Sequence, residues 1–255
     1  MKYDSYLIIA NGRSGHNFIS MNIFSWIGVI RNWNIKAYNL ENFSPHLFDK
    51  NMDFSGFVES PRNLDQNKRN QYQTRHRYID FNEKILKVVS SRDYLNWGAS
   101  YMAMQFRNPE KMKTPMRELI RRFSSTGTTN TWLNIAKEFK GFTNYIPDCH
   151  RISYEKFKDD KTYRQKICSD IGGEYNEDRL ERVTHFGDGS SFDYKDYQFK
   201  ASEMKTNERY KQMIDLPYFP VYIQMIKSNK AALGFYKQFF PLTEDQKHFI
   251  KEYIK

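Results

Sequence analysis

Residues 5–17 read SYLIIANGRSGHN, and this short segment indicates the fold class. Its first part, Ser5–Ala10, is an apolar run of the kind that forms a buried parallel strand. A turn with two glycines follows at residues 11–15, and the mostly apolar residues 18–30 are long enough for a helix. A strand, a glycine turn and a helix in this order are typical of α/β folds that hold a phosphate group at the helix N-terminus.

Two further strand–helix pairs extend this pattern along the chain. Residues 84–91 (KILKVVSS) predict a second strand, and residues 94–106 predict the helix behind it. A third strand is expected near residues 148–154, with a helix over residues 159–171. We therefore predict an α/β fold: one domain over residues 1–255 with a mostly parallel central sheet flanked by helices. A ligand is expected at the carboxyl ends of the strands.

The rest of the chain is less regular. The sequence Thr243-Glu244-Asp245-Gln246 is a capping box that starts a C-terminal helix. Residues 51–77 and 187–200 are polar and are expected to form long surface loops, which are often functional. The aromatic-rich residues 218–240 are expected to be core first, with a dimer face or a cover over the site as alternatives.

Composition narrows the class of protein. The 255 residues carry a net charge of +10, which indicates an anionic partner such as nucleic acid, an anionic surface or a phosphorylated small molecule. Twenty Phe and eighteen Tyr argue against a disordered chain. Two cysteines, Cys149 and Cys168, exclude a disulfide framework and a four-thiolate zinc site. No segment is apolar enough for a membrane helix, so a soluble protein in the cytoplasm is expected.

The glycine turn is the first constellation that could carry chemistry. It consists of Gly12, Arg13, Ser14, Gly15, His16 and Asn17. Its glycines let the backbone approach a phosphate closely, and the arginine adds a fixed fork of donors. No lysine follows Gly15, so this is not the Walker A pattern of P-loop nucleotidases. A polar turn without a ligand is the alternative.

Three other features are weak when each is taken alone. Arg92 stands at the end of the second predicted strand, and Ser100 follows it by eight positions, so both could contact one phosphate. Tyr154 stands at the end of the third strand, where a phenol ring can stack on a base. A later loop contains Ser190, Ser191 and Phe192. Ordinary strand ends and a surface turn would explain each of them equally well.

Together and in this order, these features resemble the sulfotransferases that use phosphoadenosine phosphosulfate (PAPS), with the loop variant of bacterial and phage members. The resemblance implies a P-loop-like sulfotransferase fold and the desulfated product PAP. It implies that loop residues 12–17 hold the 5′-phosphosulfate and that Arg92 and Ser100 hold the 3′-phosphate. Tyr154 and Phe192 would bound the adenine, with Ser190 and Ser191 nearby.

The chain departs from this family's pattern in two places. His16 and Asn17 stand where the usual loop has two threonines. The later Arg-Lys-Gly segment is absent, and Arg209 and Lys211 are weak substitutes for it.

The mechanism implied is an in-line displacement that moves the sulfuryl group from PAPS to an acceptor hydroxyl or amine, without a metal. His76, in Thr74-Arg75-His76, is the first candidate for the general base, while His16 and Glu59 are its rivals. Arg13 and His16 would stabilise charge on the transferred group.

Acceptor specificity is expected in residues 32–77 and 102–142, where apolar and cationic groups suit a small phenol, a lipid or an anionic glycan. A homodimer is left open. A basic nucleic-acid-binding protein, a P-loop phosphotransferase and a sulfotransferase fold that binds nucleotide without catalysis remain the alternatives. No specific nucleic-acid motif supports the first of these.

Overall fold

The computed structural model describes residues 5–11, 15–27, 58–59, 85–107, 113–123, 127–144, 146–183, 192 and 200–254. The chain divides into two compact units. The first consists of Met1–Ser91 and Asn134–Leu180, and the second of Arg92–Leu133 and Glu181–Lys255.

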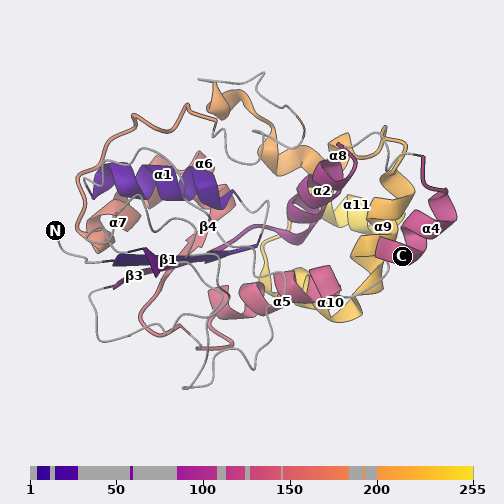
Figure 1. Cartoon of the computed structure of the whole chain (residues 1–255), viewed down its shortest axis with the longest axis horizontal. Helices are drawn as coiled ribbons and strands as arrows, with labels where there is room; N and C mark the ends of the chain where they lie inside the picture. Colours follow the sequence, from indigo (N-terminus) through magenta and orange to yellow (C-terminus); the bar gives the residue numbers. More distant parts are fainter. Residues whose placement is uncertain are drawn as a thin grey trace, which may run out of the picture. The chain divides into compact units, whose positions relative to one another are not determined.

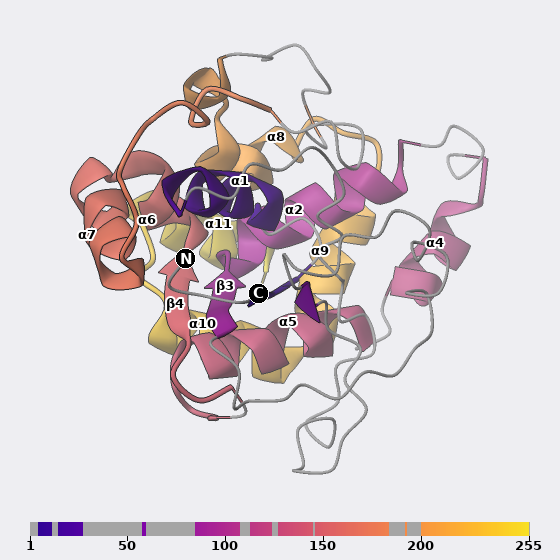
Figure 2. The ribbon, with the colours of Figure 1, turned by 60° about the vertical axis from the view of Figure 1, so that its left-hand side comes forward.

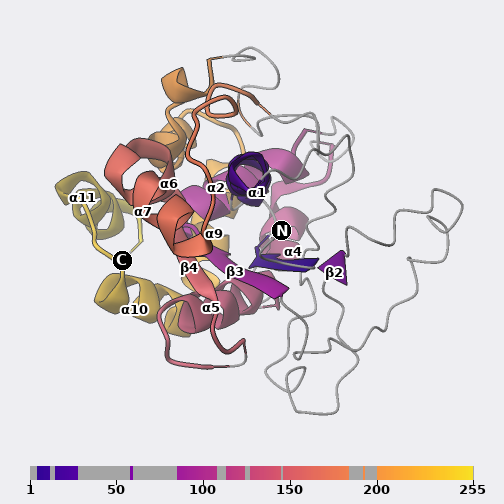
Figure 3. The same ribbon diagram turned by 90° about the vertical axis from the view of Figure 1, so that its left-hand side faces the viewer.

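The first unit is built on a four-stranded sheet in the order β2-β1-β3-β4 (Figure 3). Strands β1 (Ser5–Ala10), β3 (Ile85–Ser91) and β4 (His150–Ser153) run parallel. The two-residue β2 (Val58–Glu59) pairs antiparallel with the outer side of β1. The predicted α/β class and its mostly parallel sheet are therefore confirmed.

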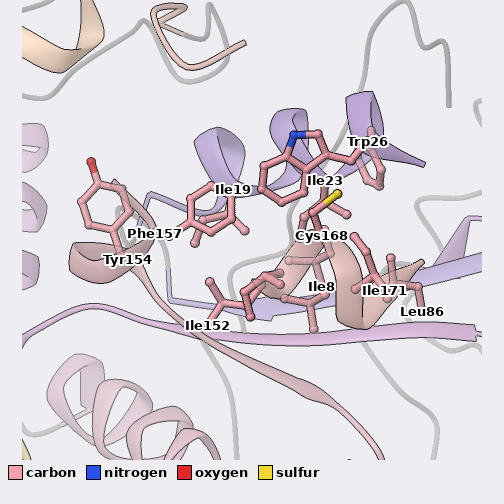
Figure 4. Close-up of a cluster of buried hydrophobic side chains, with 13 residues drawn as sticks. Ile8, Ile19, Ile23, Trp26, Leu86, Ile152, Tyr154, Phe157, Cys168 and Ile171 are labelled. Carbon is pink, nitrogen blue, oxygen red and sulfur yellow. The ribbon is translucent and has the colours of Figure 1, made fainter. Parts of the chain in front are cut away.

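Three helices of this unit cover one face of the sheet: α1 (His16–Trp26), α6 (Tyr154–Asp159) and α7 (Lys161–Ile171) (Figures 1 and 3). They bury one apolar cluster against the strands (Figure 4). The strands contribute Ile8, Leu86, Val88 and Ile152, and the helices contribute Ile19, Ile23, Phe24, Trp26, Tyr154, Phe157, Ile167, Cys168 and Ile171. This burial holds the start of α1 over the sheet.

The second unit is helical. It contains α2 (Tyr94–Gln105), α4 (Met116–Phe123), α8 (Arg209–Gln212), α9 (Phe219–Ser228), α10 (Lys230–Phe239) and α11 (Glu244–Tyr253). Two 3₁₀ turns, η5 (Ala201–Glu203) and η6 (Thr206–Glu208), precede α8. Helix α9 lies between α2 and α4 (Figure 2). The long α5 (Gly127–Phe139) gives its first half to this unit and its second half to the other.

Aromatic side chains form the core of the second unit. The rings of Tyr94 and Trp132 are 4.6 Å apart, and Trp97 stacks on Tyr94 at 5.9 Å. Tyr236 of α10 contacts both Tyr94 and Trp132. Val221, Tyr222, Met225, Ile226 and Tyr236 are buried, so one side of residues 218–240 contributes to the core, while a dimer face or a cover over the site stays a prediction.

Several element boundaries differ from the prediction. The first helix covers His16–Trp26 rather than residues 18–30. At its end, the carbonyl oxygen of Trp26 accepts a hydrogen bond from the Glu174 backbone N–H at 2.7 Å, so this helix-end carbonyl is satisfied by a residue distant in the chain. Tyr154 begins α6 instead of ending a strand. Strand β2 falls inside residues 51–77, which were expected to be loop.

The two cysteines are free thiols, as expected. Cys168 is buried and Cys149 is half-buried. Burial raises the pKa of both thiols.

Candidate functional site

The carboxyl ends of the three parallel strands meet at one edge of the sheet in the first unit. Ala10 pairs with Ser90, and Ser91 pairs with Ser153, so the last residues of β1, β3 and β4 are level with one another. The glycine turn follows β1 here, and Tyr154 follows β4. The sheet therefore brings the start of the turn and Tyr154 to the same edge, as the order of elements predicted.

Gly15 is the N-cap of α1, and its position requires glycine for two reasons. Its φ is +80°, in the left-handed region that side chains disfavour. A Cβ atom built on Gly15 would lie 2.0 Å from Cε2 of Tyr154. The tyrosine ring thus covers the glycine directly, and no larger residue fits beneath it.

Tyr154 is held in this place by its neighbours. Its ring is buried and meets Phe18 edge-on, with ring centroids 6.3 Å apart. Ser153, the residue before it, caps α6 by accepting a hydrogen bond from the Lys156 N–H at 3.4 Å. Figure 4 shows Tyr154 at one end of the apolar cluster, with its hydroxyl directed away from the other labelled side chains. Its contact with adenine stays a prediction.

The first turn of α1 has the electrostatic character of an anion site. The N–H groups of Phe18 and Ile19 both donate to the Gly15 carbonyl, at 3.0 and 3.2 Å. The earlier N–H groups of a helix have no partner within it, and the aligned peptide dipoles make this end positive. No acidic residue stands in the first turn to offset that charge.

In the second unit, two arginines converge on one serine. Nη1 of Arg92 donates to Oγ of Ser100 at 2.8 Å, and Nη1 of Arg209 donates to the same oxygen at 3.2 Å. All three side chains are buried, with 2%, 5% and 1% of Arg92, Arg209 and Ser100 exposed. Arg92 also donates to the Thr206 carbonyl oxygen. Arg92 and Ser100, which the sequence predicts to contact one phosphate, thus lie next to each other and beside a second guanidinium, while their contact with a phosphate stays a prediction.

Arg209 also reaches the predicted aromatic residue of the late loop. Its guanidinium carbon lies 5.1 Å from the centre of the Phe192 ring, within cation–π distance. Arg209 therefore links Phe192 to Ser100, two of the residues that the sequence marked separately. The sequence had treated Arg209 only as a weak substitute, because its partner Ser100 is 109 positions away.

Hydrogen bonds from the start of α2 hold this arrangement. The Asp93 carboxylate caps α2 by accepting from the Asn96 backbone N–H at 2.9 Å and from Nδ2 of Asn96 at 2.7 Å. Asn96 in turn donates to the Asn207 carbonyl at 2.9 Å and accepts from the Tyr210 N–H at 3.3 Å. The segment that carries Arg209 is thus tied to the helix that carries Ser100.

The backbone of Arg92 is held separately. Its carbonyl oxygen accepts a hydrogen bond from the indole N–H of Trp132 at 2.9 Å. Because the indole is itself buried, it fixes the chain at the point where the Arg92 side chain begins.

Several predicted residues lie outside the described part of the chain: Gly12, Arg13, Ser14, His76, Ser190 and Ser191. His16 and Asn17 begin α1, and Glu59 lies in β2, but only their backbone is described. The choice among His76, His16 and Glu59 as the general base stays open.

Two further findings concern the described residues alone. Within them, no group of three His, Cys, Asp or Glu side chains could hold a metal ion. None of the helices described is long and apolar enough to cross a membrane.

Comparisons with known proteins do not assign the chain to a family, because no protein-family model, curated protein or solved structure matches it.

Proposed function

We propose that the chain is a sulfotransferase that binds PAPS and releases PAP. The observation that carries the proposal is the convergence of Arg92 and Arg209 on the Ser100 hydroxyl. Two buried guanidinium groups beside one hydroxyl bring positive charge and several N–H donors to one point, which favours an anion there. Planar guanidinium forks match the oxygen geometry of a phosphate.

The chemistry of these donors fits the 3′-phosphate of the nucleotide. Ser100 accepts a hydrogen bond from each arginine and still has its own proton to donate. Phe192, against which Arg209 lies, offers a flat apolar surface next to this group, of the kind on which an adenine ring stacks. These features agree with the roles that the resemblance implies, in which Arg92 and Ser100 hold the 3′-phosphate and Phe192 bounds the adenine.

The transfer step rests on residues of the first unit. PAPS supplies an activated sulfuryl group whose displacement spreads negative charge over its oxygens. The start of α1 and the side chains of Arg13 and His16 would stabilise that charge. His76 would accept the proton of the acceptor hydroxyl, and no step requires a metal ion.

The test uses the nucleotide's own phosphates as probes. PAP and adenosine 5′-phosphate are titrated calorimetrically into the wild-type protein, Arg209→Lys and Arg209→Ala. Wild type should prefer PAP strongly, since charge-assisted hydrogen bonds contribute about 1.5–3 kcal/mol each. The preference should fall about tenfold or more in Arg209→Ala, because ~1.4 kcal/mol is a factor of ten in affinity. Arg209→Lys should lie between the two.

The matched control is Lys247→Ala. It removes one positive charge from the same unit, at an exposed side chain that pairs with Glu244. It should leave the preference for PAP unchanged. Equal binding of PAP and adenosine 5′-phosphate by the folded wild-type protein would refute the proposal. Binding of PAP without transfer to any phenol, lipid or glycan acceptor would indicate the non-catalytic alternative.

A further inference from the structure

Two neighbouring serines at the end of β3 have buried hydroxyls with no hydrogen-bond partner among the described residues. Ser90 is 0% exposed and Ser91 is 1% exposed, and neither Oγ is bonded. Folding with a buried hydroxyl unpaired is unfavourable, and most such groups in proteins have a partner. These unpaired hydroxyls lie at the edge of a candidate site. A ligand bound at this site would supply the missing hydrogen-bond partner.

The two hydroxyls lie on opposite faces of the sheet. Side chains alternate along a strand, so Ser90 shares its face with Leu86 and Val88, which pack beneath α1. Ser91 shares the other face with Lys87 and Val89. Of the two, Ser90 is therefore the one directed toward the side of the sheet that α1 covers.

Register places Ser90 at the end of the sheet where α1 begins. Its partners across the sheet are Ala10, which precedes the glycine turn, and Ile152, which precedes Ser153 and Tyr154. In Figure 4, Ile152 and Tyr154 lie toward the Ile19 end of α1, whereas Leu86 and Ile171 lie toward Trp26. Ser90 thus lies at the carboxyl end of β3, on the face of the sheet that α1 covers.

We propose that the Ser90 hydroxyl donates a hydrogen bond to the phosphate or sulfonate group bound at the start of α1, an inference that rests on the proposed function. The helix start supplies backbone N–H donors and the positive end of its dipole. The sequence of residues 11–17 contains a single side-chain hydroxyl, that of Ser14, so the Ser90 hydroxyl of β3 would add a second hydroxyl donor.

The experiment compares Ser90→Ala with Ser91→Ala. Each change removes one buried, unpartnered hydroxyl from the same strand, and only the face differs. We titrate PAP, adenosine 3′-phosphate and inorganic pyrophosphate into both variants and the wild type. Ser90→Ala should weaken PAP about tenfold, as expected for a hydrogen bond to a charged group. It should leave the affinity for adenosine 3′-phosphate unchanged, because that ligand has no phosphate at the 5′ position. Ser91→Ala should bind all three ligands as the wild type does.

Stability without ligand is the second readout. Removal of a hydroxyl that has no partner should leave the urea midpoint of Ser90→Ala unchanged or raised. A lowered midpoint would show that the hydroxyl has a structural partner, and the inference would fail. Equal PAP affinity in Ser90→Ala and wild type would also overturn it.

Failure of the proposed function has a different signature. If the wild type does not bind PAP, the sulfotransferase proposal fails, and pyrophosphate then decides the role of Ser90. If only Ser90→Ala binds pyrophosphate more weakly than the wild type does, the inferred contact between Ser90 and a bound anion stands. Equal or absent pyrophosphate binding in all three proteins would reject it.

Discussion

Gly15 and Gly141 have nearly the same φ, +80° and +77°, but very different surroundings. A Cβ at Gly141 meets nothing within 4 Å, whereas one at Gly15 meets the Tyr154 ring. We expect Gly141→Ala to cost about 1–2 kcal/mol, the penalty of the left-handed conformation alone. Gly15→Ala should cost a further ~1–3 kcal/mol from overpacking. Urea unfolding of the two variants measures the difference.

Replacement of the ring tests the cause of that difference. In the double variant Gly15→Ala/Tyr154→Leu, the added methyl group no longer meets an aromatic ring. Its destabilisation should be smaller than the sum of the two single changes, since contacting residues are not additive. Strict additivity would mean that the Tyr154 ring is not what requires glycine at residue 15.

At the scale of elements, helix ends hold the segment that carries Arg209. Helix α11 begins with a full capping box, in which Thr243 Oγ1 accepts from the Gln246 N–H at 3.2 Å and the Thr243 N–H donates to the Gln246 side chain at 3.0 Å. Phe249 of this helix packs edge-on against Tyr210 at 5.0 Å, beside Arg209. The cap therefore stabilises a helix that supports the arginine cluster.

Loss of this cap should reduce stability measurably. Thr243→Ala is expected to lower the free energy of unfolding by about 1 kcal/mol, because an N–H at the helix start loses its acceptor. Thr243→Ser keeps the oxygen and should restore most of the difference. A Thr243→Ala protein as stable as wild type would show that solvent replaces the cap without loss.

At the scale of the whole molecule, buried phenols make stability depend on pH at the alkaline end. Burial raises the pKa of Tyr94, and it raises that of Tyr222 well above its ordinary value. In the unfolded chain these phenols ionise at about pH 10. Above that pH the unfolded state releases protons that the folded state retains, so stability is present below about pH 10 and is lost as pH rises further.

Urea midpoints measured from about pH 8 to about pH 11 should therefore fall at the upper end of the range. Tyr94→Phe removes one titrating group from the same buried place and should flatten the fall. A midpoint that does not change across this range would contradict the expected linkage.

The sequence predicted much of the fold and, at the candidate site, the nearness of Arg92 to Ser100. Ser5–Ala10 is a strand as expected, and the second and third strands and the helices behind them start or end within a few residues of the prediction. The capping box at Thr243 was also predicted and is confirmed. These features depend on residues within one or two turns of each other, so local pattern is sufficient to find them.

Contacts between distant residues were not predictable in this way. The short β2 exists only through its pairing with β1, and α1 ends where Glu174, distant in the chain, binds its last carbonyl. The nearness of Arg92 to Ser100 was predictable, because only eight positions within one strand-to-helix segment separate them.

What the sequence alone determined is therefore the local order: strand, glycine turn, helix, caps and the charge that favours an anion. Only the tertiary structure brought Arg209 to Ser100, laid Tyr154 over Gly15 and left the Ser90 hydroxyl buried without a partner in the described chain. The physical reason is that these contacts join residues far apart in the chain. Their geometry follows from the packing of whole elements, which no local pattern encodes.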